Sequence, residues 1–88
     1  MRGSGPPQRV RLRFAPTAAR YVREKVWHPS QSLSKRKDGG VVLTMKVTTL
    51  LEVKRWVLSF GAECEVLEPA QLRREIKHDA DEMASRYV

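Results

Sequence analysis

The segment Arg9-Val-Arg-Leu-Arg-Phe14 alternates strictly between an arginine and an apolar residue. Because successive side chains of a strand point to opposite faces of a sheet, this period of two predicts a strand. One face of that strand is apolar and buried, and the other carries Arg9, Arg11 and Arg13. A strand of this kind needs a covering layer on its apolar side only, so the rest of the chain must supply further strands and that layer.

Two helical patterns can form the covering layer. Thr17, after Pro16, is predicted to cap a first helix that His28-Pro29 ends, because the residue before a proline avoids the helical region. Its apolar positions are Ala18, Ala19, Val22 and Val26. Thr49-Leu-Leu-Glu52 has the form of a capping box and begins a second helix that Gly61 ends. The apolar stripe of this second helix is Leu50, Val53, Val57 and Phe60, with Trp56 on its flank.

Asp38-Gly39-Gly40 predicts a β-hairpin between residues 30–37 and 41–49. The sequence leaves two registers open. A two-residue loop places Leu33 opposite Thr44, away from the core, whereas a three-residue loop places it opposite Met45, in the core. We favour the second register, because a slip by one residue inverts the face of every side chain in the strand.

A short strand over residues 62–66 and a final helix complete the chain, with Ala62, Cys64 and Val66 inward in the strand. The final helix has one apolar stripe, which consists of Leu72, Ile76, Ala80, Met83 and Tyr87. The order β-α-β-β-α-β, followed by a helix, predicts an α+β fold of the ferredoxin-like type. In that fold an antiparallel four-stranded sheet has the strand order 4-1-3-2 and helices on one face. We assign residues 8–88 to this single domain and residues 1–7 to a leader or linker.

The basic charge is concentrated in the first half of the chain. Residues 1–49 contain 11 Lys and Arg against two acids, whereas residues 50–88 contain six against eight acids. In the predicted sheet, the arginines of the first strand lie between Glu63 and Glu65 on one side and Thr44, Lys46 and Thr48 on the other. The candidate residues for binding nucleic acid or another anionic ligand are Arg9, Arg11, Arg13, Lys35, Arg36, Lys37 and Lys46. For residues 35–37 a second interpretation stays open, in which their charges only protect an edge strand from pairing with another chain.

The sequence argues against catalysis, metal binding and a membrane span. Cys64 is the single cysteine, so neither a disulfide nor a thiolate metal cluster can form within the chain, and the reducing cytoplasm is the expected location. His28 and His78 are not at metal-ligand spacing, and no serine has a histidine–acid pair assigned to it by the sequence. No apolar run approaches the ~20 residues of a membrane-spanning helix. We therefore expect no enzyme activity and no cofactor.

Five segments, in order, resemble a known family. They are Arg11-Leu-Arg-Phe14, Trp27-His-Pro-Ser-Gln31, Asp38-Gly39 before an alternating strand, Glu52-Val-Lys-Arg-Trp-Val-Leu-Ser-Phe-Gly61 and Val66-Leu-Glu-Pro69. Together they resemble the C-terminal extension, or WCX domain, of WYL-domain bacterial transcriptional regulators. Those regulators combine a DNA-binding winged helix-turn-helix, a WYL domain that senses ligands and this ferredoxin-like extension, which helps to form the dimer. The 88 residues contain no helix-turn-helix pattern and no Trp-Tyr-Leu segment.

The resemblance implies a non-catalytic regulatory module that mediates dimerisation and senses an anionic ligand or nucleic acid. It places Arg11 and Arg13 on an exposed strand face and residues 27–31 near a partner WYL domain. The residues expected at a domain or dimer contact are Trp27, His28, Gln31 and Trp56. Two other functions stay open: a stand-alone domain that binds nucleic acid through its phosphates, and a domain that binds a small molecule at a dimer interface.

Overall fold

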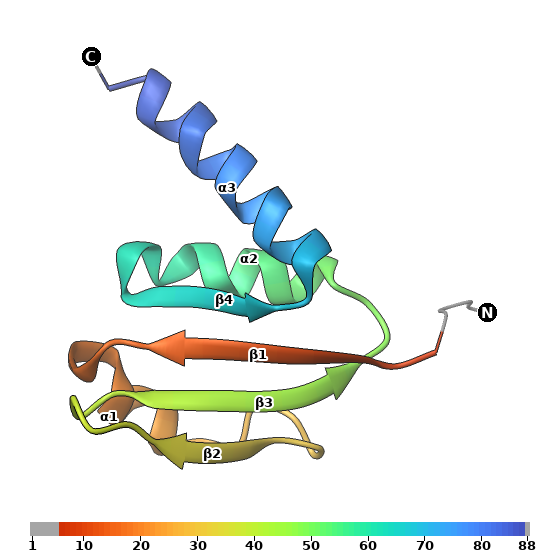
Figure 1. Ribbon diagram of the computed structural model, residues 1–88, viewed down its shortest axis with the longest axis vertical. Helices are drawn as coiled ribbons and strands as arrows, with labels where there is room; N and C mark the ends of the chain where they lie inside the picture. The colour runs from red at the N-terminus through yellow and green to blue at the C-terminus, as the bar shows by residue number, and fades with distance from the viewer. Residues whose placement is uncertain (1–5, 88) are drawn as a thin grey trace.

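The computed structural model describes residues 6–87, so the predicted leader lies outside the described residues except for Pro6 and Pro7. Four strands and three helices follow one another in the order β1, α1, β2, β3, α2, β4, α3 (Figure 1). Their bounds are Gln8–Phe14 (β1), Pro16–Arg23 (α1), Ser32–Lys35 (β2), Val41–Val47 (β3), Leu51–Ser59 (α2), Cys64–Glu68 (β4) and Ala70–Ser85 (α3). A short 3-10 turn, Gly61–Glu63, connects α2 to β4.

The strands form one antiparallel sheet in the order β2-β3-β1-β4. This is the predicted order 4-1-3-2 read from the other edge, so the α+β class, the β-α-β-β-α-β order and the arrangement of the sheet are confirmed. The helices α1 and α2 lie behind the sheet in the view of Figure 1, and no helix of residues 6–87 covers the opposite face. The sheet therefore has one covered face and one open face.

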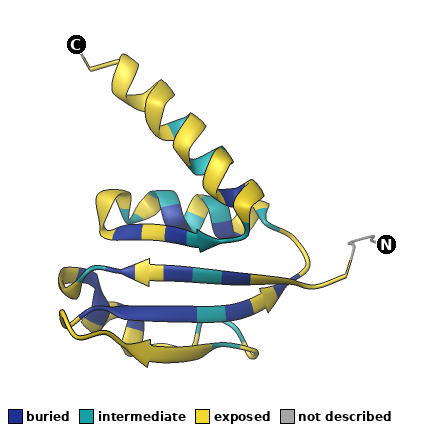
Figure 2. Cartoon of the chain, viewed as in Figure 1, coloured by how far each residue is buried: buried dark blue, intermediate teal, exposed yellow. Residues whose placement is uncertain are grey.

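The core lies between the covered face and these two helices (Figure 2). Val10, Leu12 and Phe14 of β1 are each 0% exposed, as the alternating pattern predicts. Each fully buried apolar side chain of this size contributes about 1.5–3 kcal/mol to stability. The other buried apolar residues of the core come from every remaining element except β2: Ala18, Ala19, Val22, Val41, Leu43, Met45, Val47, Val53, Val57, Cys64, Val66 and Leu72.

The hairpin has a three-residue loop, residues 37–39, but its register differs from the one that we favoured. Leu33 pairs with Leu43 rather than with Met45. Leu43 and Met45 are two residues apart and lie on the same face of the sheet, so the predicted face of Leu33 is unchanged. The reason for the different register is Gly40, which lies just before β3 and outside the loop, where its carbonyl accepts a hydrogen bond from the backbone N–H of Arg36 (2.9 Å). It is buried, and a Cβ at this position would overlap the carbonyl oxygen of Phe14. Gly39 takes the left-handed conformation of the loop, with φ of 93°.

The predicted start signals of both helices were wrong by one or two residues. Ala15 is the N-cap residue of α1, and Thr17 lies inside the helix. Leu50 is the N-cap residue of α2, so Thr49 is one residue too early to form the capping box with Glu52. The predicted stop of α2 is confirmed, since Gly61 follows the helix with φ of 60°.

The first helix is also shorter than predicted. It ends at Arg23, and Val26 is 78% exposed instead of lying on the apolar face. The indole N–H of Trp27 donates a hydrogen bond to the carbonyl of Val22 (2.9 Å), and this bond turns the chain back toward the end of the helix.

Two further predictions, on β4 and α3, need correction. Ala62 is exposed in the 3-10 turn instead of inward on a strand, because β4 begins only at Cys64. The stripe of α3 is covered only near its start, where Leu72 is buried and Ile76 packs against the core. The rest of α3 projects beyond the sheet (Figure 1), which leaves Met83 52% exposed. Tyr87, which was predicted to belong to the stripe, lies beyond the end of the helix at Ser85 and is 84% exposed.

Candidate functional site

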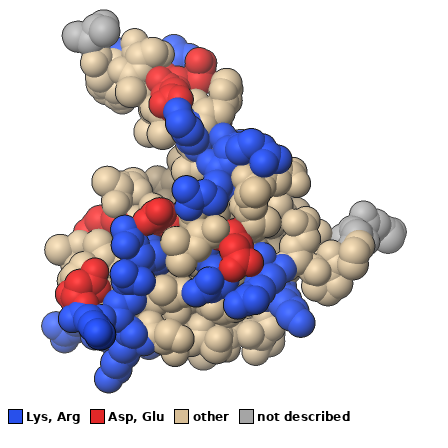
Figure 3. Space-filling model, in the orientation of Figure 1, with Lys and Arg blue, Asp and Glu red and all other residues tan. Residues whose placement is uncertain are grey.

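The open face of the sheet gathers most of the predicted basic residues. In the pairing of β1 with β3, Arg9 lies opposite Lys46, Arg11 opposite Thr44 and Arg13 opposite Val42. Because residues directly opposite each other share a face, Lys46 joins the three arginines on the open side. Figure 3 shows this face with two groups of basic side chains, one over the hairpin and one over the other end of the central strands.

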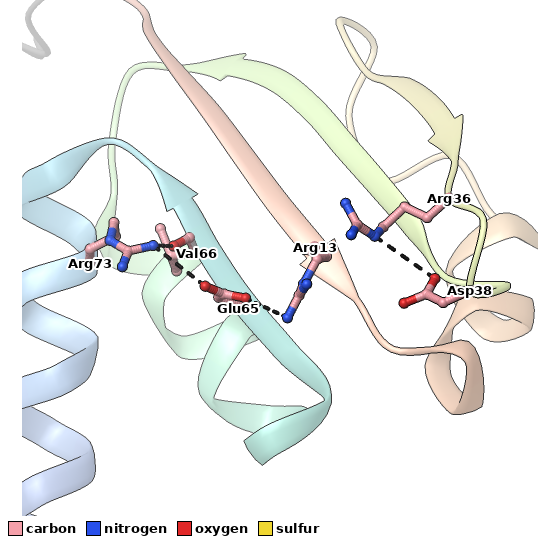
Figure 4. A network of polar contacts seen from close by, with 6 residues as sticks. All are labelled: Arg13, Arg36, Asp38, Glu65, Val66 and Arg73. Atoms are coloured by element: carbon pink, nitrogen blue, oxygen red, sulfur yellow. Dashed lines mark hydrogen bonds and ion pairs between the residues drawn. The ribbon is translucent and has the colours of Figure 1, made fainter.

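The acids of β4 neutralise part of this charge. The guanidinium of Arg13 lies 2.7 Å from the carboxylate of Glu65, and that of Arg11 lies 3.2 Å from Glu68. Arg73 of α3 also approaches Glu65 (3.6 Å) and donates a hydrogen bond to the carbonyl of Val66 (2.7 Å), as Figure 4 shows. Each pair is partly exposed, so it adds at most about 1 kcal/mol to stability.

The prediction that Glu63 flanks these arginines was wrong. Glu63 lies in the 3-10 turn, where it accepts a hydrogen bond from the hydroxyl of Thr17. Glu68 takes the place beside Arg11, because the register between β1 and β4 shifts between Arg11 and Leu12. A register shift of this kind leaves no sign in the alternation of the sequence.

The uncompensated charge lies in two places: Lys35 and Lys37 are at the hairpin, as predicted, whereas Arg9 and Lys46 are at the other end of β1 and β3. Among residues 6–87, no ion pair is formed by Arg9, Lys35, Lys37 or Lys46. Arg36 contacts only Asp38, at 3.8 Å (Figure 4). The basic residues of the hairpin and of the central strands are thus available to an anion.

A hollow on the open face brings several of these cations together. Its volume is about 470 Å³, and its lining consists of Arg11, Ser34, Lys35, Arg36, Lys37, Asp38 and Val42. Val42 pairs with Arg13 and therefore points to the open side of the sheet, where it is nevertheless buried. Four cations and one hydroxyl against a single carboxylate suit a phosphate or carboxylate group, which guanidinium groups bind through paired hydrogen bonds.

The predicted contact residues gather on the other side of the sheet. Trp27, His28 and Trp56 line one groove of about 470 Å³, which we call the tryptophan groove. The two indole rings lie 4.8 Å apart at 45°. The other residues of its lining are Met45, Val47, Thr48, Thr49, Glu52 and Val53.

Gln31, the fourth predicted contact residue, does not line the groove but holds it in shape. Its Oε1 accepts hydrogen bonds from the backbone N–H groups of Trp27 (2.5 Å) and His28 (3.1 Å). Thr49 and Glu52 were interpreted as a capping box and were not assigned to this site. With the helix beginning one residue later, these two polar side chains form part of the groove instead. Thr48 was predicted to lie beside the arginines of β1, which is wrong, because β3 ends at Val47 and Thr48 lines the groove.

The polar contacts of His28 serve the structure of the loop before β2. His28 Nδ1 lies 2.8 Å from the hydroxyl of Ser30, whose oxygen also accepts a hydrogen bond from the backbone N–H of Lys46 (2.9 Å). This contact fastens the loop before β2 to the end of β3. Burial, and to a smaller extent the charge of Glu65, raise the pKa of the Cys64 thiol to about 12, which keeps it protonated and unreactive.

These features define a small α+β domain with two candidate binding surfaces, one basic and one aromatic. A family model, the WCX domain, matches residues 6–84, and the chain therefore belongs to the WCX domain family. This membership confirms the family suggested by the five sequence segments and is consistent with a regulatory domain. No curated protein matches the chain. Among residues 6–87, no helix is long and apolar enough to cross a membrane, and no three His, Cys, Asp or Glu side chains are grouped to hold a metal.

Proposed function

We propose that this chain is the non-catalytic regulatory module of a WYL-type transcription regulator and binds an anionic effector on the open face of its sheet. The observation that carries the proposal is a set of four cations, Arg9, Lys35, Lys37 and Lys46, that form no ion pair among residues 6–87. Lys35 and Lys37 line the hollow, and Arg9 and Lys46 lie opposite each other on β1 and β3. Membership of the WCX family supports the regulatory part. The phosphates of a nucleic acid are the first candidate for the effector.

The open face suits phosphates better than bases. Base stacking needs exposed aromatic rings on the two central strands, as in RNA-binding domains with this topology. Here the open side of β1 and β3 carries Arg, Thr, Lys and Val. Contacts from such side chains go to the backbone of the nucleic acid, and they give affinity with little preference for sequence.

The number of unpaired cations sets the expected dependence on salt. If Arg9, Lys35, Lys37 and Lys46 each neutralise one phosphate of a single strand, log K falls with log[salt] with a slope of about −3. Arg11 and Arg13 add little to this slope while Glu68 and Glu65 neutralise them.

The test is fluorescence anisotropy with a labelled single-stranded oligonucleotide over a salt series from about 50 to 200 mM. Arg9→Glu and Lys46→Glu should each weaken binding and lower the slope by about 0.7 or more. Arg55→Glu is the matched control, because it makes the same change of charge on the exposed side of α2, on the covered face of the sheet. A slope near zero, or an equal loss in the Arg55→Glu variant, would contradict the proposal.

Self-association and contact with a WYL domain are the second part of the proposal. The tryptophan groove supports it, because aromatic side chains that are only half-buried are typical of interface anchors. This part is independent of anion binding, since the groove and the basic hollow have no lining residue in common.

A further inference from the structure

The molecule carries an apolar groove and an apolar helix end that do not meet each other. The groove lies between the loop after α1 and the beginning of α2, whereas the second half of α3 projects away from the sheet (Figure 1). We propose that the tryptophan groove of one copy receives the end of α3 of a second copy. In this arrangement Met83 and Tyr87 pack against the groove and Arg86 pairs with Glu52. The inference rests on the self-association part of the proposed function and names its surface.

The end of α3 exposes large apolar side chains that could pack into a groove. Met83 lies in the last turn of α3 and Tyr87 lies two residues beyond its end at Ser85, and they are 52% and 84% exposed. Met83 continues the stripe that Leu72 and Ile76 begin, and those two residues already pack into the core. The helix therefore continues past Ile76 by about two and a half turns.

Ion pairs hold the first half of α3 to α2. The ammonium of Lys54 on α2 lies 3.1 Å from Asp79 and 3.7 Å from Glu75. Together with buried Leu72, these ion pairs set the direction in which α3 leaves the sheet.

The groove has the size and lining that a helix end requires. Its volume of about 470 Å³ lies within the range of pockets that enclose apolar groups, roughly 300–1,000 Å³. Trp27, Trp56 and Val53 provide apolar walls, and Thr48 and Thr49 provide hydroxyl groups at the rim. An amphipathic helix that lays its apolar face into such a groove is a common mode of recognition.

Charge favours a second copy of this chain as the occupant. Glu52 is the single carboxylate in the lining of the groove, and no ion pair within residues 6–87 involves it. Arg86 lies next to Tyr87 at the end of α3 and likewise forms no ion pair within the described part of the chain. An arginine and a carboxylate that meet at an interface form paired hydrogen bonds. In a twofold dimer each contact occurs twice, which doubles the buried area.

Pairing of two α3 helices with each other is a weaker alternative. Asp79 and Glu82 are three residues apart on the same flank of the stripe. Asp79 is already paired with Lys54 of its own molecule, so Glu82 is the acid that faces its own copy in an antiparallel pair around the middle of the exposed stripe, where like charges repel. The groove offers a carboxylate to Arg86 and avoids this repulsion.

The test is the molar mass in solution, measured by sedimentation equilibrium from about 10 to 500 µM, the range in which a small interface associates. We expect a dimer whose dissociation constant rises about tenfold in Glu52→Arg and in Arg86→Glu. The double variant, Glu52→Arg with Arg86→Glu, should restore the wild-type constant. Arg74→Glu is the matched control on the opposite side of α3 and should have no effect. All these residues are exposed, so the variants do not endanger folding.

Three results would overturn the inference. They are a monomer over the whole concentration range, single variants that dimerise like the wild type, and a double variant without rescue. A dimer that Tyr87→Ala dissociates but Glu52→Arg does not would favour pairing between α3 helices. Oligonucleotide binding of the Glu52→Arg variant separates the two proposals, because loss of the dimer with unchanged binding leaves the basic face valid. Conversely, Lys46→Glu should lose oligonucleotide binding and keep the dimer. The proposed interface then stands if the double variant, Glu52→Arg with Arg86→Glu, restores the wild-type dissociation constant.

Discussion

Gly40 makes the sharpest prediction about the part of the fold that carries the basic hollow. A Cβ at this position would lie closer to the carbonyl oxygen of Phe14 than the 3.0 Å that real Cβ atoms keep from their neighbours. The clash is with backbone, so no side-chain rotation can relieve it, and β1 and β3 must move apart where the hairpin begins. Overpacking of a tight site costs about 1–3 kcal/mol, and we expect Gly40→Ala to lie at or above the upper end of this range.

Two other glycines provide matched controls for this effect. Gly61 has φ of 60° and no atom within 4 Å of a built Cβ, so Gly61→Ala should lose only the about 1–2 kcal/mol of a left-handed alanine. Gly39 has φ of 93° and meets only the side chain of Pro16 at 3.6 Å, so its loss should be similar. The order of stability should therefore be wild type, then Gly61→Ala and Gly39→Ala, then Gly40→Ala.

Urea unfolding followed by the fluorescence of Trp27 and Trp56 measures these losses directly, because both indoles lie in the aromatic cluster on the core. The three variants should unfold with the same m-value as the wild type and at lower midpoints. A free-energy loss for Gly40→Ala that is smaller than the loss for Gly61→Ala would refute the argument from close approach.

Three further predictions concern the core, the groove and α3. The thiol of Cys64 should react with a disulfide reagent at pH 8 far more slowly in the folded than in the unfolded protein, since its folded pKa is about 12. Because burial raises this pKa above its ordinary value of 9.0, the unfolded thiol loses its proton at a lower pH than the folded one. The free energy of unfolding should therefore fall as the pH rises from 9 toward 12, which thermal unfolding in alkaline buffers can follow. Gln31→Ala should cost about 1–3 kcal/mol in urea unfolding by leaving two backbone N–H groups without an acceptor, whereas Gln31→Glu should cost less because it keeps the acceptor. Lys54→Met should increase hydrogen exchange at the beginning of α3, by removing its ion pairs with Glu75 and Asp79, and unchanged exchange would contradict their anchoring role.

The sequence predicted the sheet because its strongest signals are local. The alternation of residues 9–14 determines which side chains of β1 are buried, and Gly61 determines where α2 ends. The boundaries that failed depend on contacts between distant residues. The bond from Trp27 to the end of α1 and the close approach of Gly40 to Phe14 become visible only once the elements are packed.

The two faces of the domain differ in how much of them the sequence could predict. The basic face follows from strand parity, so Arg9, Arg11, Arg13 and Lys46 could all be assigned to it in advance. The partner Glu68 could not, since it depends on a register shift in β4. The tryptophan groove is formed by three separate segments of the chain. Two of its polar residues, Thr49 and Glu52, have the spacing of a helix cap, so the sequence did not indicate their place in the groove.

The most direct test of the basic face is a ¹H–¹⁵N NMR titration of the whole chain with a short single-stranded oligonucleotide at low salt. The account predicts that amide shifts change in β1, β3 and the hairpin, with the largest changes near Arg9, Ser34 and Lys46. Changes confined to the tryptophan groove or to α3, or no changes at all, would contradict the claim that the open face of the sheet binds anions.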